Sequence, residues 1–141
     1  MAGEARPTGG KLWARHIFRV SDLAKSVAFY CEKLGFTQDW MEGGDDPAVA
    51  QVSRLGVTII LDKQAYWPKA GVPSVISLTL NDVPERPALD ALHRELTAAG
   101  VDASKAPFKV HWDPNVYEME VTDPDGNVLL FWGHITSSPV Q

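Results

Sequence analysis

Few side chains in this 141-residue sequence are suited to acid–base or nucleophilic chemistry. His111 is the one histidine that merits a test as an acid or base, because it precedes Trp112 in a segment expected at the edge of a cleft. Cys31 lies beside the apolar stripe of a predicted helix, so packing is its expected role. The sequence has no Gly-rich phosphate loop, nucleophile elbow or Cys-x-x-Cys motif. Nucleotide and redox chemistry therefore have no support, and no catalytic residue is predicted.

Two glutamates are candidates for contacting a cationic ligand. Glu118 and Glu120 alternate with apolar residues, so both carboxylates should point to the same face of a strand. They could bind a ligand, or they could pair with Arg15 or Arg19 of the same chain, because buried charges are rarely left unpaired. The sequence leaves these two roles equally open.

Three tryptophans are candidates for stacking on a flat ligand. Trp40, Trp67 and Trp112 lie in or next to predicted loops, where an aromatic face is accessible. The alternative role for each is packing in the core or against a second subunit. We expect at least one of them to line a cleft.

The elements that must position these side chains occur twice in the chain. Residues 13–20 are predicted to form a strand, 21–22 to cap a helix, 23–34 to form that amphipathic helix, and Gly35 to end it. The same order recurs with a strand at 75–80, capping residues at 81–82, a helix at 84–99 and a terminating glycine at 100. Three further strands are predicted after each helix, at 36–42, 48–55 and 57–62 and at 108–112, 117–122 and 128–132.

This repeat predicts an α+β fold built from two βαβββ modules. We place the modules at about 13–62 and 74–133 of a single domain, 12–133, with the linker 63–73 between them. Residues 1–11 and 134–141 are expected to be flexible ends. A three-stranded piece with one helix has a marginal core, so the modules should join into a curved mixed sheet with helices outside and a concave ligand cleft. The linker could serve pairing within one chain or between two chains.

Composition narrows the classes of partner. The net charge is −5 and no Lys/Arg-rich run occurs, so nucleic acid is not expected as a partner. The longest apolar runs are far shorter than the roughly 18 residues of a membrane span, so no membrane partner is expected either. The first residues lack the apolar core of a secretory signal, and the lone Cys31 cannot form an internal disulfide. The expected location is the cytoplasm.

Two stretches of sequence resemble a known superfamily. The first is RHIFRVSDLAKSVAFYCEKLGF, from Arg15 to Phe36, and the second is EMEVTDPDGNVLLFW, from Glu118 to Trp132. They resemble the opening segment and the last hairpin of the vicinal-oxygen-chelate superfamily, which includes glyoxalase I, bleomycin-resistance proteins and extradiol dioxygenases. The two stretches bracket most of the chain and agree with the repeat.

The resemblance implies three positions at which such enzymes hold a divalent metal. Carried over by spacing from the helix-opening aspartates and the turn asparagine, the positions fall on Arg15, Val75 and Leu130. A guanidinium and two aliphatic side chains do not bind a metal at neutral pH. We therefore expect no metal and no cofactor.

A shift of register by one residue would bring His16 into the first position. His16 shares its predicted strand face with Phe18 and Val20, however, so His16 is expected to lie in the core. Its counterpart in the second module would be Ile76, which is not a ligand either.

Without a metal, the pattern is most similar to the bleomycin-resistance subgroup. The run from Leu34 to Glu42 and the position of Trp112 resemble segments that form the cleft in that subgroup, although His111-Trp112-Asp113 stands where the subgroup has Pro-Trp-Gly. The resemblance implies a homodimer, swapped or not, that sequesters an antibiotic or another aromatic or cationic ligand. The predicted ligand-binding residues are Arg15, Trp40, Trp67, His111, Trp112, Glu118, Glu120 and Leu130.

Two enzymatic alternatives remain open. One is a divalent-metal-dependent lyase or dioxygenase of the same superfamily with a relocated metal site, for which His16 or His111 would be the first candidates. The other is a metal-free enzyme that uses His111 and a glutamate for proton transfer. Fold similarity does not choose among them, because one scaffold can host unrelated functions.

Overall fold

The computed structural model describes residues 10, 12–80, 84–102 and 107–134. The predicted N-terminal segment lies almost wholly outside the described residues, as do the predicted capping pair 81–82 and the residues after 134. Neither helix in the described part of the chain is long and apolar enough to cross a bilayer.

Two modules with the same order of elements make up the described chain. The first contains β1 (His16–Arg19), α1 (Leu23–Ala28), the π-helical turn η1 (Phe29–Lys33), β2 (Thr37–Glu42), β3 (Val49–Arg54) and β4 (Val57–Asp62). The second contains β5 (Val75–Thr79), α2 (Glu85–Ala98), β6 (Phe108–Lys109), β7 (Val116–Thr122) and β8 (Val128–His134). The predicted α+β fold of two βαβββ modules is confirmed.

Local signals explain where the first helix begins and ends. Asp22 is the N-cap, and its side chain accepts a hydrogen bond of 3.1 Å from the backbone N–H of Lys25. The helix continues as η1 and ends at Gly35, whose positive φ of 74° suits a residue without a side chain. The predicted cap and stop are therefore confirmed.

Two element boundaries differ from the sequence prediction. β6 has only two residues instead of the five expected. Val110 still donates to the carbonyl of Val116, in register with the β6–β7 pair, but the chain then turns, and the N–H of Val116 donates to the carbonyl of Asp113. β8 continues through His134, which pairs with Val116 of β7. The prediction that His134 begins the flexible tail was therefore wrong, since pairing with β7 keeps this residue in the sheet.

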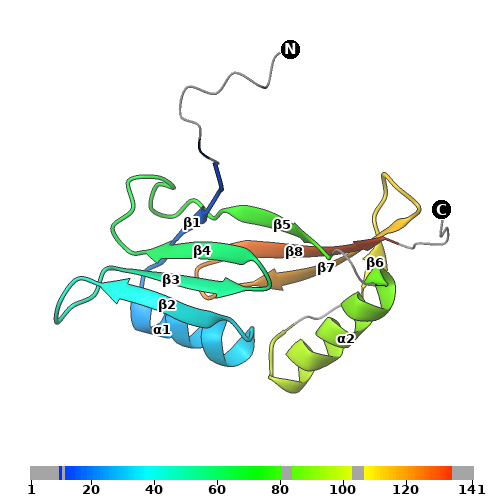
Figure 1. Ribbon diagram of the computed structural model, residues 1–141, viewed down its shortest axis with the longest axis horizontal. Coiled ribbons are helices and arrows are strands. Elements are labelled where there is room, and N and C mark those ends of the chain that lie inside the picture. The colour runs from blue at the N-terminus through cyan, green and yellow to red at the C-terminus, as the bar shows by residue number, and fades with distance from the viewer. Residues whose placement is uncertain (1–9, 11, 81–83, 103–106, 135–141) are drawn as a thin grey trace, which may run out of the picture.

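The strands form two four-stranded mixed sheets with equivalent topology. Sheet A has the order β1-β4-β3-β2 and sheet B has the order β5-β8-β7-β6. In each sheet the first strand runs parallel to the last strand of its module, and the other pairs are antiparallel. The sheets lie side by side along the long axis, with both helices on the same side of them (Figure 1). The backbone hydrogen bonds between strands are thus interrupted where the two modules meet.

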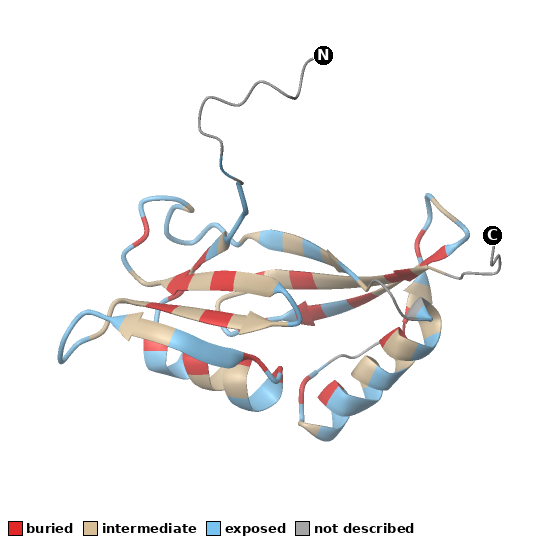
Figure 2. Ribbon diagram, in the orientation of Figure 1, coloured by how far each residue is buried: buried red, intermediate tan, exposed pale blue. Residues whose placement is uncertain are grey.

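A single apolar core spans both modules on the helix-facing side of the sheets. Buried residues occur on strands of both sheets and on the helices that cover them (Figure 2). Phe18 is fully buried, and its ring lies edge-on to His16 with centroids 5.0 Å apart. The predicted inward face of β1 is therefore confirmed. The largest fully buried side chains are those of Phe18, Tyr30, Leu34, Ile59, Leu61, Leu89, Leu96, Met119 and Leu129.

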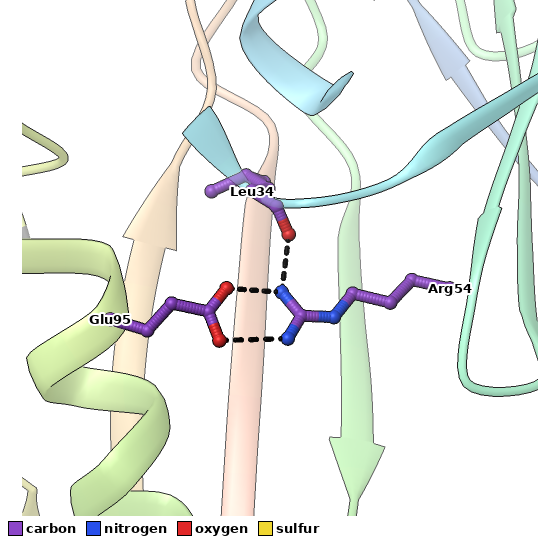
Figure 3. A network of polar contacts seen from close by, with 3 residues as sticks. All are labelled: Leu34, Arg54 and Glu95. Atoms are coloured by element: carbon purple, nitrogen blue, oxygen red, sulfur yellow. Dashed lines mark hydrogen bonds and ion pairs between the residues drawn. The ribbon is translucent and has the colours of Figure 1, made fainter. Parts of the chain in front are cut away.

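Hydrogen bonds join the modules at two places. On one side, Tyr30 donates to Asp123 in the turn between β7 and β8 at 2.9 Å, and the Asn127 side chain donates to the carbonyl of Arg19 at 3.2 Å. On the other side, Arg54 at the end of β3 forms a two-pronged ion pair with Glu95 of α2, with N–O distances of 2.8 and 2.9 Å (Figure 3). These contacts fix the position of one module against the other.

Candidate functional site

The faces of the two sheets that point away from the helices carry most of the predicted ligand-binding residues. On sheet B, Glu118 lies opposite Trp132 and Glu120 lies opposite Leu130 across the β7–β8 pair. Residues opposite each other share a face of the sheet, and the alternate residues Met119 and Val121 of β7 are buried on the other face. The prediction that Glu118 and Glu120 point to one common face is confirmed.

Glu118 is held by a tryptophan that the sequence analysis did not assign to the site. The indole Nε1 of Trp132 donates a hydrogen bond of 2.9 Å to Oε1 of Glu118. The ring of Trp112, which is 54% exposed, lies against Trp132 with centroids 5.4 Å apart and an angle of 61° between the planes. The alternation of β8 could have placed Trp132 on this face, because it follows Leu130 by two residues.

Glu120 differs from Glu118 in its surroundings. Its side chain is exposed, and among the described residues no side chain pairs with its carboxylate. A carboxylate beside an aromatic surface and open to solvent can pair with a cation while a flat group of the same ligand contacts the indole rings. Trp112, Trp132, Glu118 and Glu120 are called the aromatic–acidic surface below.

A second polar cluster, centred on Gln51, lies on the face of sheet A that points away from the helices, which is called its outer face below. Arg15 donates to the side-chain oxygen of Gln51 at 2.9 Å, and Gln51 in turn donates to Asp39 at 3.0 Å. Asp39 also accepts from the hydroxyl of Ser53 at 3.0 Å. The register of β2 against β3 shifts between Gln38 and Trp40, and this irregularity brings Asp39 into the cluster. The sequence did not predict a role for Asp39, because a β-bulge cannot be recognised from the alternation of polar and apolar residues.

Trp40 lies on the same outer face as this cluster. It pairs directly with Gln51 across β2 and β3 and is half-buried. Arg15, in addition to its bond to Gln51, lies over the ring of Trp13 at 5.0 Å from the ring centroid. Arg15, which directly precedes β1, and Trp40 of β2 therefore both lie next to Gln51.

The internal Arg–Glu pairing that the sequence left open is not formed between the described residues of one chain. Arg15 bonds to Gln51, and Arg19 bonds to the backbone carbonyl of Ala65. Glu118 accepts its hydrogen bond from Trp132 instead. Both carboxylates of sheet B therefore remain candidates for contacts with a ligand.

The two remaining predicted residues lie in connections between elements. His111 is exposed in the segment between β6 and β7, next to Trp112. Trp67 is 65% exposed in the linker after β4, with the ammonium of Lys69 5.0 Å from its ring centroid. The eight residues are therefore divided between sheet A, sheet B and two loops, and one chain alone does not gather them into one cleft.

The positions that would hold a metal in the superfamily do not fit one here. Arg15 is engaged with Gln51, Val75 is exposed at the start of β5, and Leu130 lies on the outer face of β8. Among the described residues, no three His, Cys, Asp or Glu side chains converge as a metal site requires. His16 faces the core, and burial lowers its pKa.

Comparison with known proteins identifies the family. The profile of the Glyoxalase/Bleomycin resistance protein/Dioxygenase superfamily matches residues 13–131. Bleomycin resistance proteins of Geobacillus stearothermophilus and Staphylococcus aureus are each 28% identical over 126 residues, which cover 84% of this chain and 93% of theirs.

Solved structures, one of them named as an enzyme, share the fold. A glyoxalase/bleomycin resistance protein/dioxygenase from Nocardioides has a TM-score of 0.67 at 20% identity and covers 99% of this chain and 92% of its own. A lactoylglutathione lyase from Agrobacterium tumefaciens has a TM-score of 0.66 at 14% identity and covers 87% of this chain and 93% of its own. The fold itself does not choose between binding and catalysis. The family profile, which spans both modules, shows that this chain belongs to the Glyoxalase/Bleomycin resistance protein/Dioxygenase superfamily.

Proposed function

We propose that this protein is a cytoplasmic, bleomycin-resistance-like homodimer that sequesters an aromatic, cationic small molecule without using a metal. The observation that carries the proposal is the aromatic–acidic surface, where the exposed Trp112 lies beside Trp132 and the carboxylate of Glu120, which pairs with no described side chain, is open to solvent. Aromatic rings supply a stacking surface, and a carboxylate supplies the counter-charge. The net charge of −5 also favours the approach of a cation.

The arrangement of the two sheets supports the proposed homodimer. In one chain the outer faces of sheets A and B lie side by side, so neither face encloses a ligand alone (Figure 1). Packing sheet A of one copy opposite sheet B of another would bring Arg15 and Trp40 across from Glu118 and Glu120. Such a pairing would also cover Ile17 and Val75, which are 42% and 55% exposed on these faces. Sedimentation equilibrium should give twice the monomer mass of 15.5 kDa.

Within the aromatic–acidic surface, we assign different roles to the two glutamates. Glu118 orients the indole of Trp132 through its hydrogen bond, and Trp132 in turn supports Trp112. Glu120 supplies the charge that pairs with the ligand. Loss of either group should therefore weaken binding for a different reason.

Isothermal titration calorimetry with bleomycin and a panel of aromatic cationic drugs tests the proposal. Glu120→Gln should weaken binding about two- to fivefold, the range expected for a partly exposed ion pair. Trp112→Ala should weaken it by about fivefold or more, because stacking is lost. Glu32→Gln on the helical side makes the same charge change at an exposed site and should leave binding unchanged.

Two outcomes would overturn the proposal. One is the absence of binding by every drug in the panel. The other is a stoichiometric divalent metal in the purified protein, found by elemental analysis and lost on substitution of His16 or His111, which would favour the metal-dependent lyase or dioxygenase instead.

A further inference from the structure

An apolar cavity lies at the boundary between the two modules, on the helix-facing side of the sheets. Its volume is about 70 Å³. The first module contributes Leu34, Phe36 and Val57 to its lining, and the second contributes Leu78, Leu96 and Phe131. Leu78 and Phe131 are direct partners across β5 and β8, on the opposite face from the aromatic–acidic surface. The cavity is therefore distinct from the ligand surfaces described above.

The lining of this cavity favours an uncharged, apolar occupant. Cavities walled by leucine and phenylalanine stay free of water, because a water molecule needs two or more polar partners. An apolar cavity of about 150 Å³ is large enough for benzene. The cavity here is smaller but open on one side, so a single ring or a short alkyl group could enter it partway.

Among the described residues that line the cavity, the charged one is Arg54, and its charge is already neutralised. Arg54 lies at the rim and gives two hydrogen bonds to Glu95, at 2.8 and 2.9 Å, and a third to the carbonyl of Leu34 at 2.6 Å (Figure 3). A guanidinium held in this way by a carboxylate is poorly placed to attract an anionic ligand. The described lining therefore offers no free charge to attract a charged head group.

Leu55, which also lines the cavity, is a second observation that points to a ligand. It occupies the two-residue turn between β3 and β4 with Gly56, and the φ angles of the two residues are +51° and +87°. Turns of this kind favour asparagine or aspartate at the first position, and leucine is strained there. The Leu55 side chain is also 83% exposed. An apolar residue that is both strained and exposed beside an apolar cavity suggests a functional contact.

We propose that the module-boundary cavity binds a small, uncharged, apolar molecule, with Leu55 covering the part that projects from the cavity. The proposal is independent of the function proposed for the outer sheet faces. Since both modules line the cavity, an occupant would stabilise the joined form of the two modules.

Methyl NMR of the full chain with toluene as the probe tests this proposal. Toluene should shift the methyl signals of Val57, Leu78 and Leu96, with a dissociation constant on the order of 1 mM for so small a ligand. Val75 and Leu130 on the outer faces report binding elsewhere. Crystals pressurised with xenon should show a xenon site among the same lining residues.

Leu55→Asn and Leu12→Asn form a matched pair of variants. Leu55→Asn should weaken toluene binding about three- to tenfold, because apolar contact is lost, while the free protein becomes no less stable, because asparagine suits the turn. Leu12 is fully exposed and does not line the cavity, so Leu12→Asn should leave the affinity unchanged.

Three results would overturn the proposal. They are no methyl shift at toluene saturation together with no xenon in the cavity, shifts confined to Val75 and Leu130, or equal affinities for the Leu55→Asn and Leu12→Asn variants.

Discussion

Removing the hydroxyl of Tyr30 should weaken the contact between the two modules. Tyr30 is fully buried, and its hydroxyl donates at 2.9 Å to Oδ2 of Asp123, which is only 4% exposed. Burial, followed by the nearby charge of Asp123, raises the pKa of Tyr30 far above its usual range, so the hydroxyl stays protonated and remains a donor. The hydrogen bond therefore persists across the neutral and mildly alkaline range.

The size of the effect follows from the partners that Asp123 keeps. In Tyr30→Phe, Asp123 still accepts from the side chain of Asn127 at 3.0 Å and from the backbone of Asp125 and Asn127 at 2.8 and 2.9 Å. The loss is thus one hydrogen bond to a charged group, worth about 1.5–3 kcal/mol. We expect about 2 kcal/mol of destabilisation.

Equilibrium unfolding in urea measures this change directly. With an m-value of about 2 kcal/mol/M, the midpoint should fall by about 1 M. Tyr117→Phe is the matched control, because Tyr117 is half-buried beneath Arg86 and no described residue bonds to its hydroxyl. The control should change stability by less than about 0.5 kcal/mol.

The pH dependence gives a second check with a defined sign. The pKa of Tyr30 is raised in the folded state, so its contribution to stability is complete below the unfolded pKa of about 10 and declines as the pH rises past it. The difference between wild type and Tyr30→Phe should therefore shrink above about pH 10. If Tyr30→Phe is as stable as Tyr117→Phe at pH 7, the buried inter-module hydrogen bond does not have the strength argued above.

Two further predictions concern the Arg54–Glu95 ion pair. The hydrogen bond from Arg54 lowers the pKa of Glu95, so the pair should stabilise the protein above the unfolded pKa of about 4.3 and lose this effect as the pH falls through the lower folded value. At pH 7, Glu95→Gln should cost less than about 1 kcal/mol of stability, because the pair is partly exposed. Thermal unfolding curves of the wild type and the variant should converge near pH 3. Gly35→Ala would place a Cβ 2.7 Å from Nη1 of Arg54 at a φ of +74°, whereas Gly44→Ala meets nothing within 4 Å at a φ of +64°. Both should lose about 1–2 kcal/mol to backbone strain in urea unfolding, and only Gly35→Ala should lose more by displacing Arg54, so equal losses would contradict this account.

Local patterns in the sequence were enough to predict the modules. Asp22 caps the first helix and Gly35 ends it because capping and left-handed conformations depend on a few neighbouring residues. The burial of Phe18 beside His16 follows from the two-residue period of a strand. The common face of Glu118 and Glu120 follows from the same period. These features needed no knowledge of contacts between distant parts of the chain.

Long-range pairing decided which candidate residues meet. Trp132 reaches Glu118 only because β7 and β8 pair in one register, and Asp39 joins Gln51 only because β2 carries an irregularity against β3. No local pattern specifies a register shift, since it depends on how two strands fit over a shared core. The tertiary structure therefore added two residues to the candidate surfaces.

The sequence also did not predict how the two modules are arranged relative to each other. The repeat predicted two similar halves and a cleft, but it did not determine whether their sheets face each other or lie side by side. The structure places Arg15 against sheet A and Glu118 on sheet B, and it leaves an apolar cavity where the modules meet. The physical reason is that packing between modules depends on the shapes of whole surfaces, assembled from residues as distant in sequence as Tyr30 and Asp123. Periodicity along the chain determines the fold of each module, whereas only the packed structure determines what lies between them.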